Sequence, residues 1–166
     1  MFFLRLEGGM QYLVAIVVMI LVYFFLKSNI GKMSSQQPNR KANLNGLPFL
    51  HGPGTFSVDI VGESHYQNAL NRICGGKTAD GHNLIVQAEL IHEDHNPHDS
   101  QAIRIDIHGM TVGYFSKKLA QEYRKRITES GYPGVTAVCN AMIVGGWKRD
   151  EHDEGHYGVK LDLPKG

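Results

Sequence analysis

The chain has 166 residues, which predicts one folded domain, and its formal net charge of +1 gives no overall basic footprint of the kind that nucleic-acid-binding domains often carry. Its two cysteines, Cys74 and Cys139, are too few for a disulfide scaffold or for a zinc site built on cysteine pairs. Composition therefore excludes those two classes of protein and leaves an ordinary globular domain.

The apolar stretch from Met10 to Leu26, interrupted by Gln11, predicts a helix through the lipid bilayer, within a membrane anchor at residues 1–27. At about 1.5 Å per residue the stretch spans roughly 25 Å, slightly less than a hydrocarbon core of about 30 Å. A signal peptide is the competing interpretation, but no small-residue cleavage site follows the stretch. A buried core helix would rarely be apolar on every face.

Basic residues follow the apolar stretch at Lys27, Lys32, Arg40 and Lys41. Arg5 is the one basic residue before it, so the positive-inside rule predicts a single-pass protein of the inner or cell membrane with its C-terminal domain in the cytoplasm. Residues 28–54 show neither a helical nor a strand period and are rich in polar residues, Gly and Pro. We expect a flexible linker there.

The domain expected at residues 55–166 begins with a strand, a helix and a longer strand. Residues 56–60 alternate between apolar and polar, as a half-buried strand does. Ser64 is expected to cap a helix that ends at Gly75–Gly76. Residues 84–91 alternate again, which predicts a strand with one strongly apolar face.

The second half predicts a hairpin, a helix and two further strands. A strand at 103–107 turns at Gly109 into a return strand at 110–114. Ser116 is expected to cap a helix that runs to about residue 130, with basic side chains, Arg124 among them, on its outer face. The last expected elements are strands at 135–144 and 157–163 and a charged turn at 148–156. Short strands with two short helices and no strand–helix–strand rhythm predict a small, curled, mainly antiparallel sheet or barrel.

A polar loop joins the two middle strands, and we take it as the candidate site. Pro97 fixes a backbone angle there, and Asn96 and Asp99 are residue types that bond to their own backbone in turns. The loop is expected to present Asn96, His98 and Asp99 together.

Three groups of residues resemble a HIRAN domain when they are taken together. The groups are Gly62-x-x-x-Tyr66, Glu93-x-x-Asn96-Pro97-x-Asp99-x-x-Ala102-Ile103 and Val112-Gly113-Tyr114-Phe115-x-x-x-Leu119-Ala120. The resemblance covers about residues 55–163. It implies an OB-like small β-barrel, which in members fused to DNA-remodelling helicases binds single-stranded DNA and captures its 3′ end.

The resemblance implies a role for each matching residue. Asp99 would accept a hydrogen bond from the terminal 3′-hydroxyl, because an ionised carboxylate suits a donor. Tyr66 would contact a base or the backbone, and a stacked base gains about 1–3 kcal/mol from such a ring. Lys117 would reach a phosphate, with Tyr114 beside it. The expected nucleic-acid-binding set is completed by His65, Asn96 and His98.

Some positions depart from the family's pattern. His65 and His98 stand where DNA-binding members carry aromatic residues, and Ser64 stands where an arginine can occur. Other positions have a second interpretation that the sequence leaves open. These alternatives are a turn cap for Asp99, a core position for Tyr66 and a solvated helix face for Lys117.

His92, His95 and His98 lie close in sequence to Asp94 and Asp99, and such nitrogen and oxygen ligands can bind a metal. No HExxH spacing or cysteine pair accompanies them, and on a strand-to-loop segment their side chains would point in several directions. We treat the three histidines as weak metal candidates. Neither a catalytic motif nor a cofactor is expected.

The sequence therefore predicts a membrane-anchored module that recognises 3′ ends of single-stranded DNA and is not an enzyme. A membrane-tethered domain that keeps the fold but binds a protein partner is the alternative. A metal-dependent hydrolase is the third hypothesis.

Overall fold

The computed structural model describes residue 44 and residues 46–165. The predicted membrane anchor at residues 1–27 and most of the predicted linker lie outside the described residues. Within the described part, no helix has the length and apolar character that a membrane crossing needs. The membrane anchor and its orientation therefore stay predictions.

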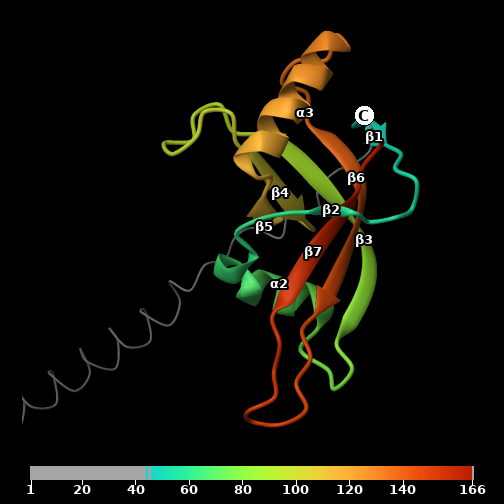
Figure 1. Cartoon of the computed structure of the whole chain (residues 1–166), viewed down its shortest axis with the longest axis vertical. Coiled ribbons are helices and arrows are strands. Elements are labelled where there is room, and N and C mark those ends of the chain that lie inside the picture. Colours follow the sequence, from blue (N-terminus) through green and yellow to red (C-terminus); the bar gives the residue numbers. More distant parts are fainter. Residues whose placement is uncertain (1–43, 45, 166) are drawn as a thin grey trace, which may run out of the picture. The chain divides into compact units, whose positions relative to one another are not determined.

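The described elements are short and mostly strands (Figure 1). The strands are β1 (Phe49–Leu50), β2 (Val58–Asp59), β3 (His82–His92), β4 (Ile103–Ile107), β5 (Met110–Tyr114), β6 (Ala137–Gly145) and β7 (Tyr157–Asp162). The helical elements are the 3₁₀ turn η1 (Glu63–His65) and the α-helices α2 (Gln67–Cys74) and α3 (Lys117–Glu129).

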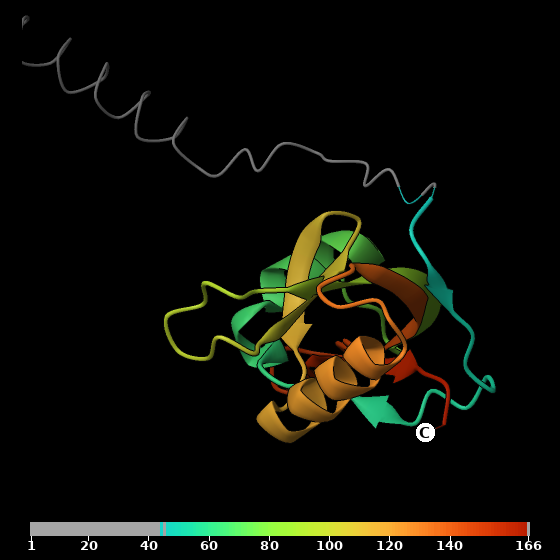
Figure 2. The same cartoon turned by 90° about the horizontal axis from the view of Figure 1, so that it is seen from above.

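Six strands follow the spatial order β2-β7-β6-β3-β4-β5, and each neighbouring pair is antiparallel. The short β1 lies parallel to the start of β6. β3 pairs with β6 from His82 to Leu90 and with β4 from Glu89 to His92, so it carries the sheet round a bend. Figures 1 and 2 show the curled sheet that results, which confirms the prediction of a mainly antiparallel, curled sheet with two helices.

The two ends of the strand order meet at one point. Val61, just after β2, exchanges backbone hydrogen bonds with Tyr114 at the end of β5, at 2.8 and 2.9 Å. Gly113 makes this approach feasible, because a Cβ at that position would lie 2.8 Å from the Val61 carbonyl oxygen. The sheet is thus a half-barrel whose first and last strands touch beside Tyr114.

The core lies inside the curl. Ile103, Ile105 and Ile107 of β4 are all fully buried, as the alternation predicts. Ala120 and Tyr123 of α3 cover the same core. Each buried branched side chain contributes about 1.5–3 kcal/mol by leaving water, so this apolar row is the main term that holds β4 and its loop in place.

Of the turns and helix caps predicted from local sequence, some are confirmed and one is wrong. His108 and Gly109 both have positive φ, 51° and 72°, as a two-residue hairpin turn of the mirror-image type needs. Ser116 Oγ accepts a hydrogen bond from Leu119 N at 3.3 Å, which confirms the predicted cap of α3. The predicted cap at Ser64 is wrong. Gly62, in the left-handed conformation, starts the 3₁₀ turn η1 instead, and α2 begins only after Tyr66.

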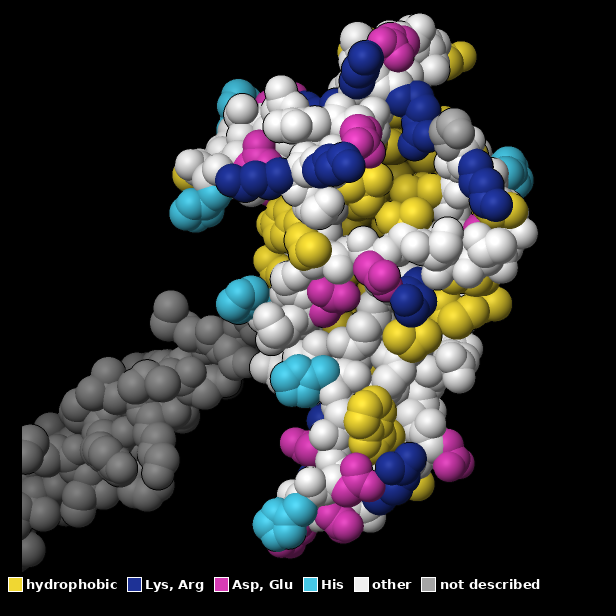
Figure 3. Space-filling view, viewed as in Figure 1, with side chains coloured by type: hydrophobic (Ala, Val, Ile, Leu, Met, Phe, Trp, Pro, Cys, Tyr) yellow, Lys and Arg dark blue, Asp and Glu magenta, His cyan; other side chains and the backbone are white. Residues whose placement is uncertain are grey.

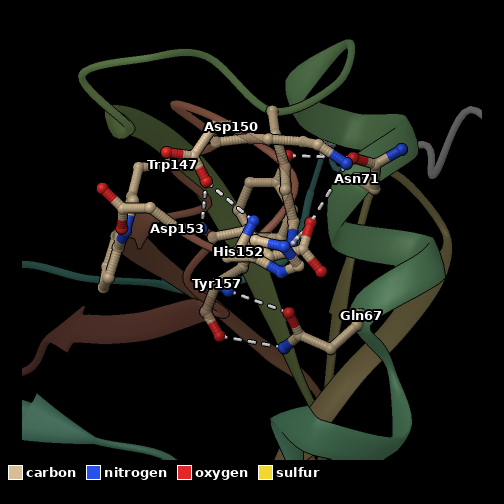
Figure 4. Close-up of polar contacts among 10 residues, drawn as sticks. Gln67, Asn71, Trp147, Asp150, His152, Asp153 and Tyr157 are labelled. Carbon is tan, nitrogen blue, oxygen red and sulfur yellow. Dashed lines mark hydrogen bonds and ion pairs between the residues drawn. The ribbon is translucent and has the colours of Figure 1, made fainter.

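A side-chain amide attaches α2 to the sheet (Figure 4). Gln67 Nε2 donates to the carbonyl of Tyr157 at 2.9 Å, and its Oε1 accepts from Tyr157 N at 2.8 Å. The Tyr157 hydroxyl donates to Asn71 Oδ1 at 3.0 Å. Gly146 leaves room for the tyrosine ring, because a Cβ there would lie 2.0 Å from a ring carbon. These contacts fix the start of α2, and with it the segment that carries Tyr66.

Candidate nucleic-acid interface

The site loop, residues 93–102, joins β3 to β4 and projects from the body of the domain (Figures 1 and 2). Asn96 organises it, because its Oδ1 accepts from the backbone N–H groups of His98 at 2.9 Å and Asp99 at 3.3 Å. Its Nδ2 donates to Glu93 Oε2 at 2.8 Å. Asn96 is therefore a structural residue of the loop, with both ends of its amide in use.

Asp99 takes part in the same turn. Its Oδ1 accepts from Gln101 N at 2.9 Å, and its carbonyl accepts from Ala102 N at 3.0 Å. One carboxylate oxygen of Asp99, Oδ1, therefore caps the turn, as one of the two interpretations expected. Among the described residues, Oδ2 has no hydrogen-bond donor, and the side chain is half-buried. One acceptor of this carboxylate stays free for a donor from outside.

Two arginines from other elements hold the base of the site loop. Arg104 of β4 donates from Nη1 to Glu93 Oε1, and its Nε lies 2.9 Å from Asp106 Oδ1. Arg124 of α3 donates to Asp94 Oδ1 at 2.6 Å and to the backbone carbonyls of Gln101 and Ala102, at 2.8 and 3.0 Å. The prediction that Arg124 faces solvent on the outer side of its helix is wrong, because it spans to the loop.

Two tyrosines lie side by side next to this network. The ring centroids of Tyr66 and Tyr114 are 6.3 Å apart, with planes tilted by 46°. Tyr66 is half-buried and is not one of the core residues, so the core interpretation of Tyr66 does not hold. Tyr114 is the β5 partner of Arg104 on β4. The aromatic pair therefore borders the strand that holds the loop.

Electrostatics join the tyrosines to the loop through Glu93. Burial raises the pKa of Tyr114, and its hydrogen bond with Tyr66 and the nearby charge of Glu93 raise it further. Burial would raise the pKa of Glu93, but hydrogen bonds from Asn96, Arg104 and Tyr114 outweigh burial and hold that pKa below its ordinary value. Glu93 is thus ionised at neutral pH, and Asn96 and Arg104 donate to its two carboxylate oxygens.

Two further carboxylates lie on the same side of β3 and β4. Asp106 is 8% exposed and pairs across the strands with Glu89. Burial first, and then repulsion by Asp106, raises the pKa of Glu89. Arg104 is the cation that compensates this group of acids. Three carboxylates and one guanidinium give the region beside the tyrosines a negative net charge, which repels phosphate.

The predicted site residues divide into two sets. Tyr66 pairs with Tyr114, Tyr114 is the strand partner of Arg104, and hydrogen bonds run from Arg104 through Glu93 and Asn96 to the backbone N–H groups of His98 and Asp99. His65 and Lys117 stand outside that set. His65 is exposed in η1 beside Tyr66, and Lys117 is exposed at the start of α3 with no hydrogen bond or ion pair to a described residue of the set. The solvated-face interpretation of Lys117 is the one its surroundings match.

Charge is unevenly spread over the surface. Figure 3 shows Lys and Arg side chains around the end of the molecule that carries α3, and acidic side chains on the β6–β7 hairpin at the opposite end. Five basic and two acidic residues lie in α3, whereas residues 148–156 hold four acidic and two basic ones. The site loop thus lies near the more basic end, although the surface beneath the tyrosines is acidic.

The three histidines of the weak metal prediction do not gather. In the described residues no group of three or more His, Cys, Asp or Glu side chains is placed to bind a metal ion. His92 faces the core side, with its ring centroid 6.0 Å from that of Tyr123, and neither of its ring nitrogens has a partner. His95 and His98 are exposed on the loop. The separation follows because His92 is the last residue of β3, whereas His95 and His98 lie on the projecting loop.

Sequence reasoning missed Glu93, Arg104 and Arg124 as the residues that hold the site. Arg104 and Asp106 stand two apart on the polar face of β4, and that spacing of opposite charges was a signal. Arg124 gave no local signal, because its partners are 22 to 30 residues away in the chain. Comparison with known family models, curated proteins and solved structures yields no match for this chain.

Proposed function

We propose that this protein is a binding module for 3′ ends of single-stranded DNA, built on an OB-like barrel of the HIRAN type. The observation that supports it most is that the Tyr66–Tyr114 pair lies beside Arg104, which holds the loop that carries Asp99. A half-exposed aromatic pair offers a face for a terminal base. The free oxygen of Asp99 offers an acceptor for the 3′-hydroxyl, which is a donor.

Preorganisation supports the same function. The loop is held by Asn96 from within and by Arg104 and Arg124 from outside, so binding does not have to order it. The acidic surface under Tyr114 favours a strand terminus over an internal segment, because a terminus carries a hydroxyl where the chain would otherwise continue with a phosphate. Phosphates further back would lie toward the basic α3 and Lys117.

The membrane anchor at residues 1–27, with the domain in the cytoplasm, forms part of this proposal and rests on the sequence alone. Tethering would confine the module to DNA ends near the inner face of the membrane. Protease treatment of intact spheroplasts should leave the C-terminal domain uncut. Digestion of the domain by protease added outside would show that the orientation is the reverse of the proposed one.

Substitutions test the assignment of roles within the site. Asp99→Asn keeps an oxygen to accept from Gln101 N but removes the charge, so the turn should survive while the 3′-hydroxyl contact weakens. Tyr66→Ala should raise the dissociation constant for a short oligonucleotide by about 5- to 150-fold, since one stacked base is worth about 1–3 kcal/mol. Tyr132→Ala, an equally aromatic change at a 61% exposed position after α3, is the control and should leave affinity unchanged.

Fluorescence anisotropy with a 5′-labelled oligonucleotide measures all three variants on residues 40–166, a range that contains the whole described core. Equal affinities for wild type, Tyr66→Ala and Asp99→Asn would rule out this site. Loss of binding in Tyr132→Ala as well would assign the effect to general destabilisation.

A protein-interaction domain on the same fold is the second candidate. The carboxylates of Glu89, Glu93 and Asp106 favour it, because their negative net charge beside the single Arg104 would also attract the basic side chains of a protein partner. A partner retained on the immobilised domain after nuclease treatment, and lost in Tyr66→Ala, would favour this candidate over DNA.

A further inference from the structure

The first half of β3 has an unpaired edge. From His82 to Leu90, β3 pairs with β6 on one side, and β4 takes up the other side from Glu89 onward. Residues Asn83–Gln87, which we call the free edge, have no strand on that other side among the described residues. In Figure 1 this part of β3 runs along the margin of the sheet. Its outward N–H and C=O groups are therefore available to another strand.

The free edge lacks the features that normally prevent strand pairing between molecules. Asn83–Gln87 reads Asn-Leu-Ile-Val-Gln and contains no charged residue, proline or glycine. Leu84 is 37% exposed and Ile85 is 59% exposed, two of the four large hydrophobic side chains that are exposed in the described part. An uncharged, branched, partly exposed strand edge favours addition of a further strand.

The pattern of the free edge is symmetrical about Ile85. Amide side chains stand at both ends, Asn83 and Gln87, and apolar ones at Leu84 and Val86. In an antiparallel pair of two such edges centred on Ile85, each Asn83 lies opposite a Gln87, and each Leu84 opposite a Val86. Such self-complementarity is what a two-fold interface between identical subunits requires. A charged strand would place like charges opposite each other across the two-fold axis, whereas Asn83–Gln87 carries no charge.

The neighbouring strand β6 adds a further apolar side chain to this pairing. Met142 of β6 is the partner of Ile85 across the sheet, and it lies on the same outer face. Two copies would therefore join four apolar side chains in one row, Met142–Ile85 from each copy. Cross-strand apolar pairs of this kind contribute roughly 0.2–1 kcal/mol each.

We propose that the free edge pairs with the free edge of a second copy of this chain, antiparallel and centred on Ile85, to form a homodimer with one continuous sheet. This interface is separate from the site loop, so each copy keeps its own site. A dimer would present two sites at once.

Sedimentation equilibrium of residues 40–166, and of the full chain in detergent, measures the association. The expected result is a reversible dimer whose dissociation constant rises at least about tenfold in Ile85→Lys, because a lysine at this position places two like charges across the axis. Tyr132→Lys, the same kind of change at a 61% exposed position elsewhere, should leave it unchanged. A monomer at all concentrations, or a dimer equally strong in Ile85→Lys, would overturn the proposal.

Amide hydrogen exchange identifies what covers the edge. The proposal predicts that protection of residues 83–87 rises with protein concentration and falls in Ile85→Lys. Protection that is independent of concentration in the full chain, and missing from residues 40–166, would assign the edge to residues before 40 instead. Rapid exchange under all conditions would show an edge that stays open, and it would likewise refute the dimer.

Discussion

The site loop and the turn of the β6–β7 hairpin are both charged segments between strands, but they are held in different ways. The site loop is held by Arg104 of β4 and Arg124 of α3, whose side chains are mostly buried. In the hairpin turn, residues 146–156, Trp147 Nε1 donates to Asp153 Oδ1 at 3.1 Å (Figure 4), and Lys148 N donates to the carbonyl of Thr78 at 2.8 Å. The site loop therefore depends on mostly buried ion pairs, whereas the ion pairs of the hairpin turn are exposed.

Arg104 gives the largest expected difference between the two regions. Arg104→Met leaves the buried carboxylate of Asp106 and the half-buried one of Glu93 without their cation, and breaking a buried pair from one side typically costs about 3–5 kcal/mol. We expect the free energy of unfolding, measured by urea denaturation, to fall by about that amount. Arg149→Met breaks the exposed pair with Asp153 in the hairpin and should cost less than about 1 kcal/mol. Equal losses of unfolding free energy in the two variants would mean that the ion pairs of the site loop are no stronger than those of the hairpin.

As the pH falls, we expect the end of β3 next to the site loop to lose stability at a higher pH than the hairpin does. Burial, and next the positive charge of Arg124, lower the pKa of His92, while Asp94 acts in the opposite direction. A folded-state pKa below the unfolded value of about 6.5 means that the unfolded chain binds the proton more readily. This contribution to stability is therefore present above that pH and is lost as the pH falls below it.

His92→Phe tests the assignment of this pH dependence. The variant removes the titrating group while it keeps a ring against Tyr123, so its stability should decline less than that of wild type between about pH 7 and 5.5. His152→Phe, at an exposed position of the hairpin, should decline as wild type does. Identical pH profiles for all three proteins, from urea unfolding at each pH, would mean that His92 carries none of the acid sensitivity.

The smallest effect is expected inside the hairpin. Asp153→Ala removes the acceptor of Trp147 Nε1 and of Arg149 Nη1, both at the tip of the molecule. We expect a loss in unfolding free energy smaller than that of Arg104→Met and an unchanged oligonucleotide affinity, because these bonds are open to water. Weaker DNA binding in this variant, measured by anisotropy, would place the binding surface at the hairpin rather than at the site loop.

The same contrast explains which features the sequence could predict. The turn at Gly109 and the cap at Ser116 were predictable because each depends on residues within three positions of it. The buried alternation of β4 was predictable because a strand's period is fixed. Ser64 failed as a cap because Gly62 and the attachment of Gln67 to Tyr157, 90 residues away, decide where α2 begins.

Contacts between distant segments account for the rest. The joining of Val61 to Tyr114 and the reach of Arg124 to the site loop depend on how the sheet curls, which no local pattern encodes. The loop's internal bonding through Asn96 could be expected from its residue types. The hydrogen bonds from the two arginines to the loop could not be expected from the sequence. The Tyr66–Tyr114 pair could not be expected either, because its members are 48 positions apart.

Recognition of a 3′ end is measured most directly with two oligonucleotides that differ at one group. Wild-type residues 40–166 are titrated with the same short single strand ending in a 3′-hydroxyl or in a 3′-phosphate, at one fixed salt concentration. We expect at least about tenfold tighter binding of the hydroxyl form, because the charged acceptor at Asp99 gains a donor in one case and meets a like charge in the other. Equal affinity for the two strands, or no binding of either, would contradict the proposed recognition of a 3′ end.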